Sequence, residues 1–202
     1  MKTTDTQKNM EKELVERVKK GDDNAFEDII KLYEQKVHST IFYMIKNESA
    51  VEDIAQEVFI KVYRNLSKFN EKSSLYTWIY RITVNACYDE IKREKKIISI
   101  SNHIDTEDGE QEVEFEDEKQ NVSEIVESKL ERKMLIDTIK MLPEESRSLI
   151  VLRDIRGFSY WEIADMLNMK LGTVKSKINR SRNQLKTLLE SKGFNYYLDN
   201  QD

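Results

Sequence analysis

Turn-forming residues are nearly absent from this sequence, which has five glycines and one proline among 202 residues. Sandwiches and barrels of β-strands need many turns, and those turns depend on glycine and proline. Charged side chains make up 35% of the chain and hydrophobic ones only 39%, so the helices should be amphipathic. We therefore predict an all-α protein.

One acidic segment divides the chain. Residues 105–118 contain nine carboxylates and no basic side chain, although the net charge of the whole chain is only −5. A run of like charges repels itself and cannot build a core, so it predicts a flexible linker. We expect a small helical domain over residues 1–98, an acidic disordered linker over 99–125 and a second helical domain over 126–202. Composition alone favours a solubilising spacer as the linker's role.

The N-terminal segment has the apolar periodicity of several amphipathic helices. Between residues 24 and 46 we predict a helix that turns Phe26 and Ile30 toward the core. A capping-box pattern at Ser49 and Glu52 predicts the start of the next helix. The core stripe of that next helix is Val51, Ile54, Ala55, Val58 and Val62.

The outer face of the same helix carries Asp53, Gln56 and Ile60, opposite the core stripe. Isolated exposed apolar residues are common, so a plain solvated face is one interpretation. An isoleucine between an acid and an amide also fits a docking surface for another protein. Periodicity leaves both interpretations open.

A mixed row of side chains lies along one flank of a helix predicted at residues 74–95. Aromatic rings stack on unpaired bases, cations neutralise phosphates, and an amide can hydrogen-bond a base edge. The row therefore fits a surface that binds single-stranded nucleic acid. The alternative is a partly packed tryptophan beside an ordinary charged flank. Its members are Trp78, Arg81, Asn85, Tyr88 and Lys92.

The C-terminal segment has the spacing of a helix-turn-helix. A capping-box pattern at Ser159 and Glu162 opens a short helix. In that helix the small Ala164 permits a second helix to approach closely. Asn168, in the turn, tolerates a left-handed backbone conformation. The apolar residues that would hold the second helix follow at Val174 and Ile178.

The second helix of this motif is strongly basic. Residues 170–186 include six lysines and arginines and no acid. This charge pattern is typical of a recognition helix that enters the major groove of DNA. The predicted exposed face holds Lys175, Ser176, Asn179, Arg180 and Asn183, with Lys177 and Arg182 at its edges.

Three segments resemble conserved regions of a known family. They are VEDIAQEVF at residues 51–59, WIYRITVN at 78–85, and LPE at 142–144 followed by GTVKSK at 172–177. In this order they are similar to regions two and four of the extracytoplasmic-function (ECF) sigma factors. The resemblance covers about residues 11–95 and 130–190. It implies a dissociable subunit that gives bacterial RNA polymerase its promoter specificity in transcription initiation.

The resemblance also implies roles for individual residues. Core RNA polymerase, through the clamp of its β′ subunit, would bind Asp53, Gln56, Glu57 and Ile60. The minus-10 element would be melted and held by Trp78, Arg81, Asn85, Tyr88 and Lys92, with Asn85 on a flipped base and the loop at residues 67–73 closing over it. The minus-35 element would be read by Lys175, Ser176, Lys177, Asn179, Arg180 and Arg182.

Further expectations follow from the same resemblance. The second domain would contact the β flap, and the acidic linker would thread the RNA exit path of the polymerase. An anti-sigma factor is expected to control the protein, which would act in the cytoplasm. Asn168 and Ser181 depart from the family's usual residues at those positions. The preferred minus-35 sequence therefore stays open.

Other classes of protein fit the sequence less well. One cysteine, Cys87, and two histidines do not suffice for a usual zinc site, and no phosphate loop or nucleophile–base pair is present. We expect no enzyme activity, no metal and no cofactor. The longest apolar run, residues 41–45, is far too short to span a membrane, and no signal peptide is evident.

Two alternatives remain open at this point. A helix-turn-helix regulator that does not act as a sigma factor would have no need of Trp78, Arg81 and Asn85, because it binds only duplex DNA. A sigma factor of the related class that controls toxin genes is the other alternative.

Overall fold

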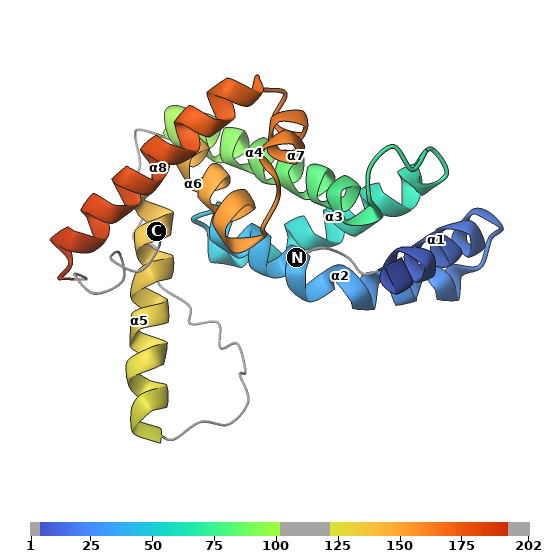
Figure 1. Cartoon of the computed structure of the whole chain (residues 1–202), viewed down its shortest axis with the longest axis horizontal. Coiled ribbons are helices and arrows are strands. Elements are labelled where there is room, and N and C mark those ends of the chain that lie inside the picture. The colour runs from blue at the N-terminus through green and yellow to red at the C-terminus, as the bar shows by residue number, and fades with distance from the viewer. Residues whose placement is uncertain (1–4, 102–121, 194–202) are drawn as a thin grey trace. The chain divides into compact units, whose positions relative to one another are not determined.

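The computed structural model describes residues 5–101 and 122–193, and every regular element in these two ranges is a helix (Figure 1). The all-α prediction is therefore confirmed for the described residues. The chain divides into two compact units, Met1–Thr106 and Glu107–Asp202. The acidic segment at residues 105–118 lies outside the described residues.

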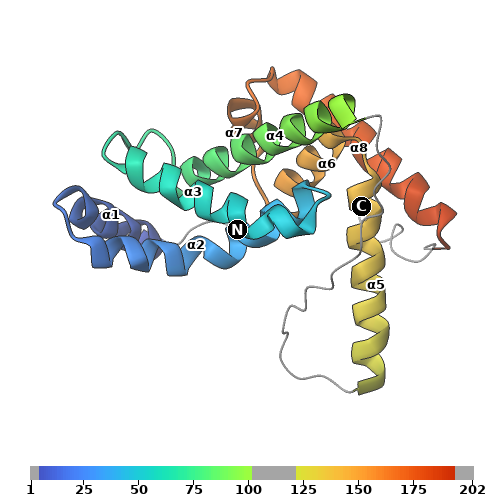
Figure 2. The ribbon, with the colours of Figure 1, turned by 180° about the vertical axis from the view of Figure 1, so that it is seen from behind.

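Within residues 5–101, the N-terminal unit is built of four α-helices, which run back and forth (Figure 2). These are α1 (Asp5–Lys19), α2 (Asp23–Met44), α3 (Val51–Leu66) and α4 (Leu75–Ser101), with a short 3-10 turn, Glu48–Ala50, before α3. The chain reverses after α1 at Gly21, whose φ of +90° is one that glycine adopts without strain. Asp22 then caps α2, because its side chain accepts a hydrogen bond from the backbone N–H of Ala25.

Apolar stripes of α2, α3 and α4 meet in the core of this unit. The fully buried side chains of these three helices include Ile29, Val37, Ile41, Val58 and Ile79. Four of the five residues predicted for the α3 stripe, Ile54, Ala55, Val58 and Val62, are buried. The fifth, Val51, is only half-buried because it is the first residue of the helix.

Two local predictions for this unit are wrong. Ser49 does not cap α3; it lies inside the 3-10 turn, and Asn47 caps that turn instead by accepting from the Ser49 N–H. Phe26 and Ile30 are only half-buried. The apolar arc of α2 is wider than the surface that its neighbours cover, so these two side chains lie at the edge of the core.

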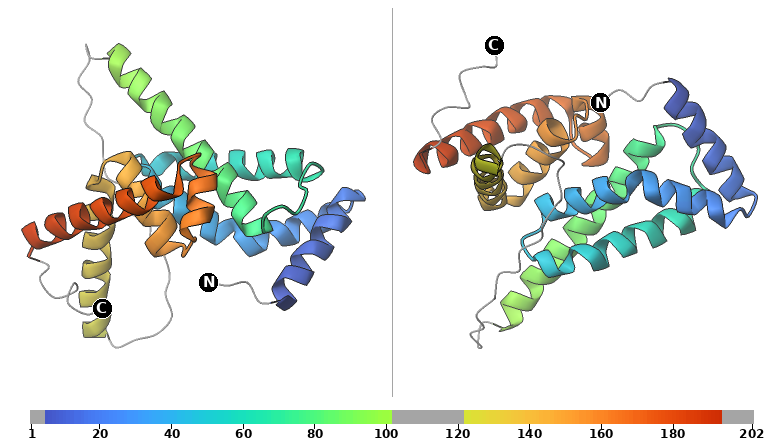
Figure 3. Two further views of the ribbon diagram at one scale, coloured as in Figure 1. Left: turned by 45° about the horizontal axis from the view of Figure 1, so that its top comes forward. Right: turned by 90° about the horizontal axis from the view of Figure 1, so that it is seen from below.

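The C-terminal unit is a second small helical assembly. Its elements are α5 (Val122–Met141), α6 (Glu144–Ile150), a π-helical turn (Val151–Ile155), α7 (Tyr160–Met166) and α8 (Leu171–Ser191). Helix α8 packs against α5, α6 and α7 (Figure 3). None of the helices in the described ranges has an apolar stretch that could cross a membrane.

The helix-turn-helix prediction is confirmed in its details. Ser159 and Glu162 form the capping box at the start of α7. Asn168 has a φ of +51°, the left-handed conformation expected for the turn. The backbone N–H of Met169 donates to the carbonyl of Ala164 at 2.8 Å, which closes the turn. Val174 and Ile178 are buried at 0% and 1% exposure, so they hold α8 in place.

Candidate docking and nucleic-acid interfaces

The outer face of α3 is exposed. Asp53, Gln56 and Glu57 lie on the surface, and Ile60 is 50% exposed. The Gln56 amide donates to the Glu52 carboxylate at 3.3 Å, and Glu57 pairs with Lys61 at 2.7 Å, so both contacts stay within the helix. The predicted placement of this face is confirmed, and its side chains are accessible to a partner.

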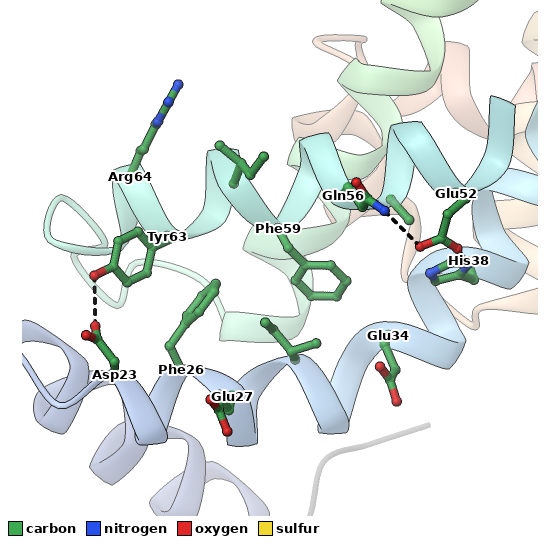
Figure 4. Close-up of a pocket in the computed structure, with 13 residues that line it drawn as sticks. Asp23, Phe26, Glu27, Glu34, His38, Glu52, Gln56, Phe59, Tyr63 and Arg64 are labelled. Atoms are coloured by element: carbon green, nitrogen blue, oxygen red, sulfur yellow. Dashed lines mark hydrogen bonds and ion pairs between the residues drawn. The ribbon is translucent and has the colours of Figure 1, made fainter.

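This face continues into a groove between α2 and α3, with a volume of about 780 Å³ (Figure 4). Its apolar lining is supplied by Phe26 and Ile30 of α2 and by Phe59, Ile60 and Tyr63 of α3. The rings of Phe26 and Tyr63 meet edge to face at a centroid distance of 4.9 Å. The groove therefore has an apolar floor that is formed by packed side chains of both helices.

The rim of the groove is mainly acidic. Asp23, Glu27 and Glu34 come from α2 and Glu52 from α3, against the single guanidinium of Arg64. Tyr63 donates its hydroxyl to Asp23 at 2.9 Å, and the carboxylate raises the pKa of the phenol. An apolar floor with an acidic rim suits a partner that presents apolar side chains flanked by lysine or arginine.

Sequence reasoning placed the α3 face correctly but missed the α2 half of the groove. It assigned Phe26 and Ile30 to the core, because periodicity along one helix does not show how far the neighbouring helix extends. The sequence does contain a signal for them: α2 has more apolar residues than a single buried stripe needs, so some of them must lie at the surface.

The mixed row along α4 is present as one stripe. Asn85 and Lys92 are exposed, whereas Trp78, Arg81 and Tyr88 are half-buried. Trp78 is partly covered because its ring packs on Phe69 from the preceding loop, at a centroid distance of 5.2 Å. The row therefore combines a Trp78 ring held by Phe69 and a half-buried Tyr88 with a solvent-accessible amide and ammonium.

The exposed face of α8 matches the predicted recognition face. Lys175, Ser176, Asn179 and Arg180 are all exposed. Ser176 donates its hydroxyl to the carbonyl of Thr173 at 3.0 Å, within its own helix. The Lys175 ammonium lies 6.0 Å from the ring centroid of Tyr160, the first residue of α7.

The two edge cations of α8 are engaged elsewhere in the same unit. Lys177 pairs with Glu145 of α6, and Arg182 pairs with Asp154 of the π-helical turn through two hydrogen bonds. The Asp154 carboxylate raises the pKa of Arg182. These ion pairs connect α8 to α6 and to the π-helical turn. Lys177 and Arg182 therefore have acidic partners within the unit, unlike the residues of the exposed face.

A cation–aromatic cluster borders the recognition face. The guanidinium of Arg153 lies 4.5 Å from the centroid of the Tyr160 ring and also donates to the carbonyl of Phe158 at 2.8 Å. Next to it, Trp161 is 71% exposed. The sequence analysis did not single out either aromatic residue.

No group of three or more histidine, cysteine, aspartate or glutamate side chains that could hold a metal ion occurs in the part of the chain that the structure describes.

Comparison with known families identifies both units. The family model Sigma-70 region 2 matches residues 29–97, and the model Sigma-70, region 4 matches residues 132–185. The ECF RNA polymerase sigma-E factor of Haemophilus influenzae is 34% identical, over 88% of this chain and 94% of its own length. The ECF RNA polymerase sigma factor SigW of Bacillus subtilis is 34% identical, over 89% and 97%.

This chain belongs to the ECF sigma factors. The region 2 match covers α2 from residue 29, all of α3 and most of α4. It therefore includes the α4 row and the α3 side of the groove, whereas Phe26 lies just before it. The region 4 match includes the helix-turn-helix.

Solved structures share the fold of this sigma factor. CnrH, in complex with the cytosolic domain of CnrY, matches with a TM-score of 0.64 at 21% identity, over 90% of this chain and 98% of that chain. The sigma factor RpoE of Bartonella quintana, in complex with the anti-sigma factor NepR, matches with a TM-score of 0.65 at 21% identity, over 82% and 96%.

Proposed function

We propose that this ECF sigma factor binds core RNA polymerase and directs it to promoters with two sequence elements. One observation carries the proposal. The α4 row of aromatic, cationic and amide side chains lies in one unit, and the exposed basic face of α8 lies in the other. We assign the first to single-stranded DNA and the second to duplex DNA. A regulator that only binds duplex DNA needs the second surface alone.

Polymerase docking is assigned to the N-terminal unit. Asp53, Gln56, Glu57 and Ile60 supply the α3 side, and the groove adds Phe26 and Ile30 from α2. The β′ clamp would insert apolar side chains into the groove and place basic ones at its acidic rim.

The C-terminal unit would dock separately. Leu130 and Met141 of α5 are 61% and 55% exposed. They are eleven residues apart, about three helical turns, so they lie on one face of the helix. We assign this face to the β flap.

Promoter opening is assigned to the α4 row. Extruding a base from the duplex costs a few kcal/mol of stacking and pairing. Trp78 and Tyr88 offer rings for stacking, Arg81 and Lys92 offer charge for phosphates, and the Asn85 amide would hydrogen-bond the edge of the extruded base. These contacts offset the cost of melting at the minus-10 element.

Duplex recognition is assigned to α8. Lys175, Ser176, Asn179 and Arg180 would face base edges in the major groove at the minus-35 element. Lys177 and Arg182 would contribute to phosphate binding only after loosening their contacts with Glu145 and Asp154.

Control and location complete the proposal. RpoE of Bartonella quintana was solved with an anti-sigma factor, and we propose that an anti-sigma factor also holds this protein. Acting with RNA polymerase, it would work in the cytoplasm. The chain itself would be no enzyme, because synthesis of the phosphodiester bond belongs to the polymerase. The division into two helical domains joined by an acidic linker, expected at residues 99–125, stays part of the proposal. Helix α4 runs to Ser101 and α5 begins at Val122, so the linker would lie between these two helices.

The test is transcription by purified core polymerase on a pool of randomised promoter sequences, with and without the chain. The proposal predicts start sites that appear only when the chain is added. A folded protein that binds duplex DNA but produces no new start site would instead be a helix-turn-helix regulator.

A further inference from the structure

Helix α1 has no role in the function proposed above, yet it contacts the loop between α3 and α4. The Lys19 ammonium donates to the backbone carbonyl of Phe69 at 3.3 Å, and Lys12 pairs with the Glu71 carboxylate at 3.1 Å. The two lysines are seven residues apart, about two helical turns, so they lie on the same face of α1. This helix and the loop lie side by side in both views of Figure 3.

The loop has a backbone conformation that needs support. Glu71 has a φ of +59°, which is uncommon for a residue other than glycine and costs free energy unless the surroundings hold it. Asn70 stabilises the turn locally by accepting from the backbone N–H of Lys72 at 3.3 Å. The two lysines of α1 add contacts from residues 50 or more positions away in sequence.

The supported loop reaches the α4 row through Phe69. The Phe69 ring is only 7% exposed and packs on Trp78, the first member of the row, at a centroid distance of 5.2 Å. The Lys19 ammonium donates its hydrogen bond to the backbone carbonyl of this same residue, Phe69. Fixing the Phe69 carbonyl therefore limits where the Phe69 ring, and with it the Trp78 ring, can lie.

We propose that α1 is a brace for the minus-10 site, with Lys19 as the main positioning residue and Lys12 as a weaker one. Lys19 forms a charge-assisted hydrogen bond to a main-chain oxygen, whereas the exposed Lys12–Glu71 pair contributes little. The brace keeps the loop at residues 67–73 and the Trp78 ring ready to receive an extruded base. This inference rests on the proposed contact between the α4 row and the minus-10 strand.

The test uses the full chain carrying Trp161→Phe, which leaves Trp78 as the only tryptophan. Lys19→Met is compared with Lys20→Met, a change at the neighbouring exposed lysine, and with Lys19→Arg. Three quantities are measured: amide hydrogen exchange at residues 67–73, Trp78 fluorescence, and affinity for single-stranded oligonucleotides that carry the non-template minus-10 sequence found in the start-site experiment.

For Lys19→Met we expect faster exchange in the loop, altered Trp78 fluorescence and about two- to tenfold weaker oligonucleotide binding, the range of one hydrogen bond. Lys20→Met should match wild type, and Lys19→Arg should restore binding. Wild-type exchange and affinity in Lys19→Met would overturn the proposal. Faster exchange with unchanged affinity would also overturn it, because Lys19 would then be merely structural.

The proposed minus-10 contact is tested separately by the wild-type chain. If wild type does not prefer the minus-10 oligonucleotide over a scrambled one, that contact fails, and the inference about the brace fails with it. Loop exchange in Lys19→Met still reports whether α1 holds the loop.

Discussion

Asn85 lies on the surface of α4 and is the residue of the row that we propose to contact the extruded base. It is exposed, while its neighbours in the row, Arg81 and Tyr88, are half-buried. The packing of the N-terminal unit does not depend on its amide. A role in promoter opening can therefore be separated from a role in folding.

Replacing Asn85 by Ala should leave polymerase binding unchanged but impair promoter opening. The extruded base would lose its edge hydrogen bonds, while the cost of unstacking it, a few kcal/mol, stays the same. Permanganate footprinting of thymines at the minus-10 element measures opening directly. Wild-type reactivity in this variant would place the base contact elsewhere.

Arg180 and Lys177 are both cations of α8, but their surroundings predict different effects on substitution. Arg180 is exposed, so it can reach a base edge. Arg180→Ala should reduce the preference for one base over the others at one position of the minus-35 element, by about 1–3 kcal/mol for a bidentate contact. Lys177 pairs with Glu145 at the edge of the face and would contact only phosphate once that pair loosens, so Lys177→Ala should weaken binding equally for all sequences. Titration of a set of single-base duplex variants distinguishes the two. Equal loss of discrimination in both variants would contradict this assignment.

At the scale of the element, the groove is lined by both α2 and α3, and we propose that the two helices form one docking surface. Ile60 and Ile97 provide a matched pair, since they are 50% and 56% exposed and only Ile60 lines the groove. Ile60→Ser should weaken core polymerase binding by at least about fivefold, or about 1 kcal/mol, as for a contact that matters at an interface. Ile97→Ser should bind normally. Equal affinities for the two variants would mean that the groove is merely solvated.

The junction of α1 and α2 should respond to pH. Arg17 donates to Asp22 at 2.9 Å, and this hydrogen bond holds the pKa of Asp22 below its usual value. The stability from this pair is fully present above the unfolded-state pKa, about 4, and is lost as pH falls through the lower folded-state pKa.

Urea unfolding of the full chain measures this effect, with Trp161→Phe as the background so that Trp78 reports on the N-terminal unit. The loss of stability caused by Asp22→Asn should be constant near neutral pH and shrink toward zero in acid. A loss that grows as pH falls would contradict the sign of the pKa shift.

At the scale of the whole molecule, the features that could be predicted from sequence are those set by neighbouring residues. The capping box at Ser159, the left-handed turn at Asn168 and the buried stripe of α3 depend on spacings of a few residues. The features that could not be predicted join distant segments. Lys177 and Glu145 are 32 residues apart, and the groove that exposes Phe26 depends on how α2 and α3 meet. The apolar periodicity of one helix does not show which residues of another helix it will contact.

We propose that one chain uses two separate surfaces to read two promoter elements. Sequencing transcript starts from a randomised promoter pool, with core polymerase and the full chain, tests it most directly. The account predicts two blocks of sequence preference, with Arg180→Ala relaxing only the upstream block and Asn85→Ala reducing initiation without altering that block. Preference in a single block, or start sites identical to those of core polymerase alone, would contradict it.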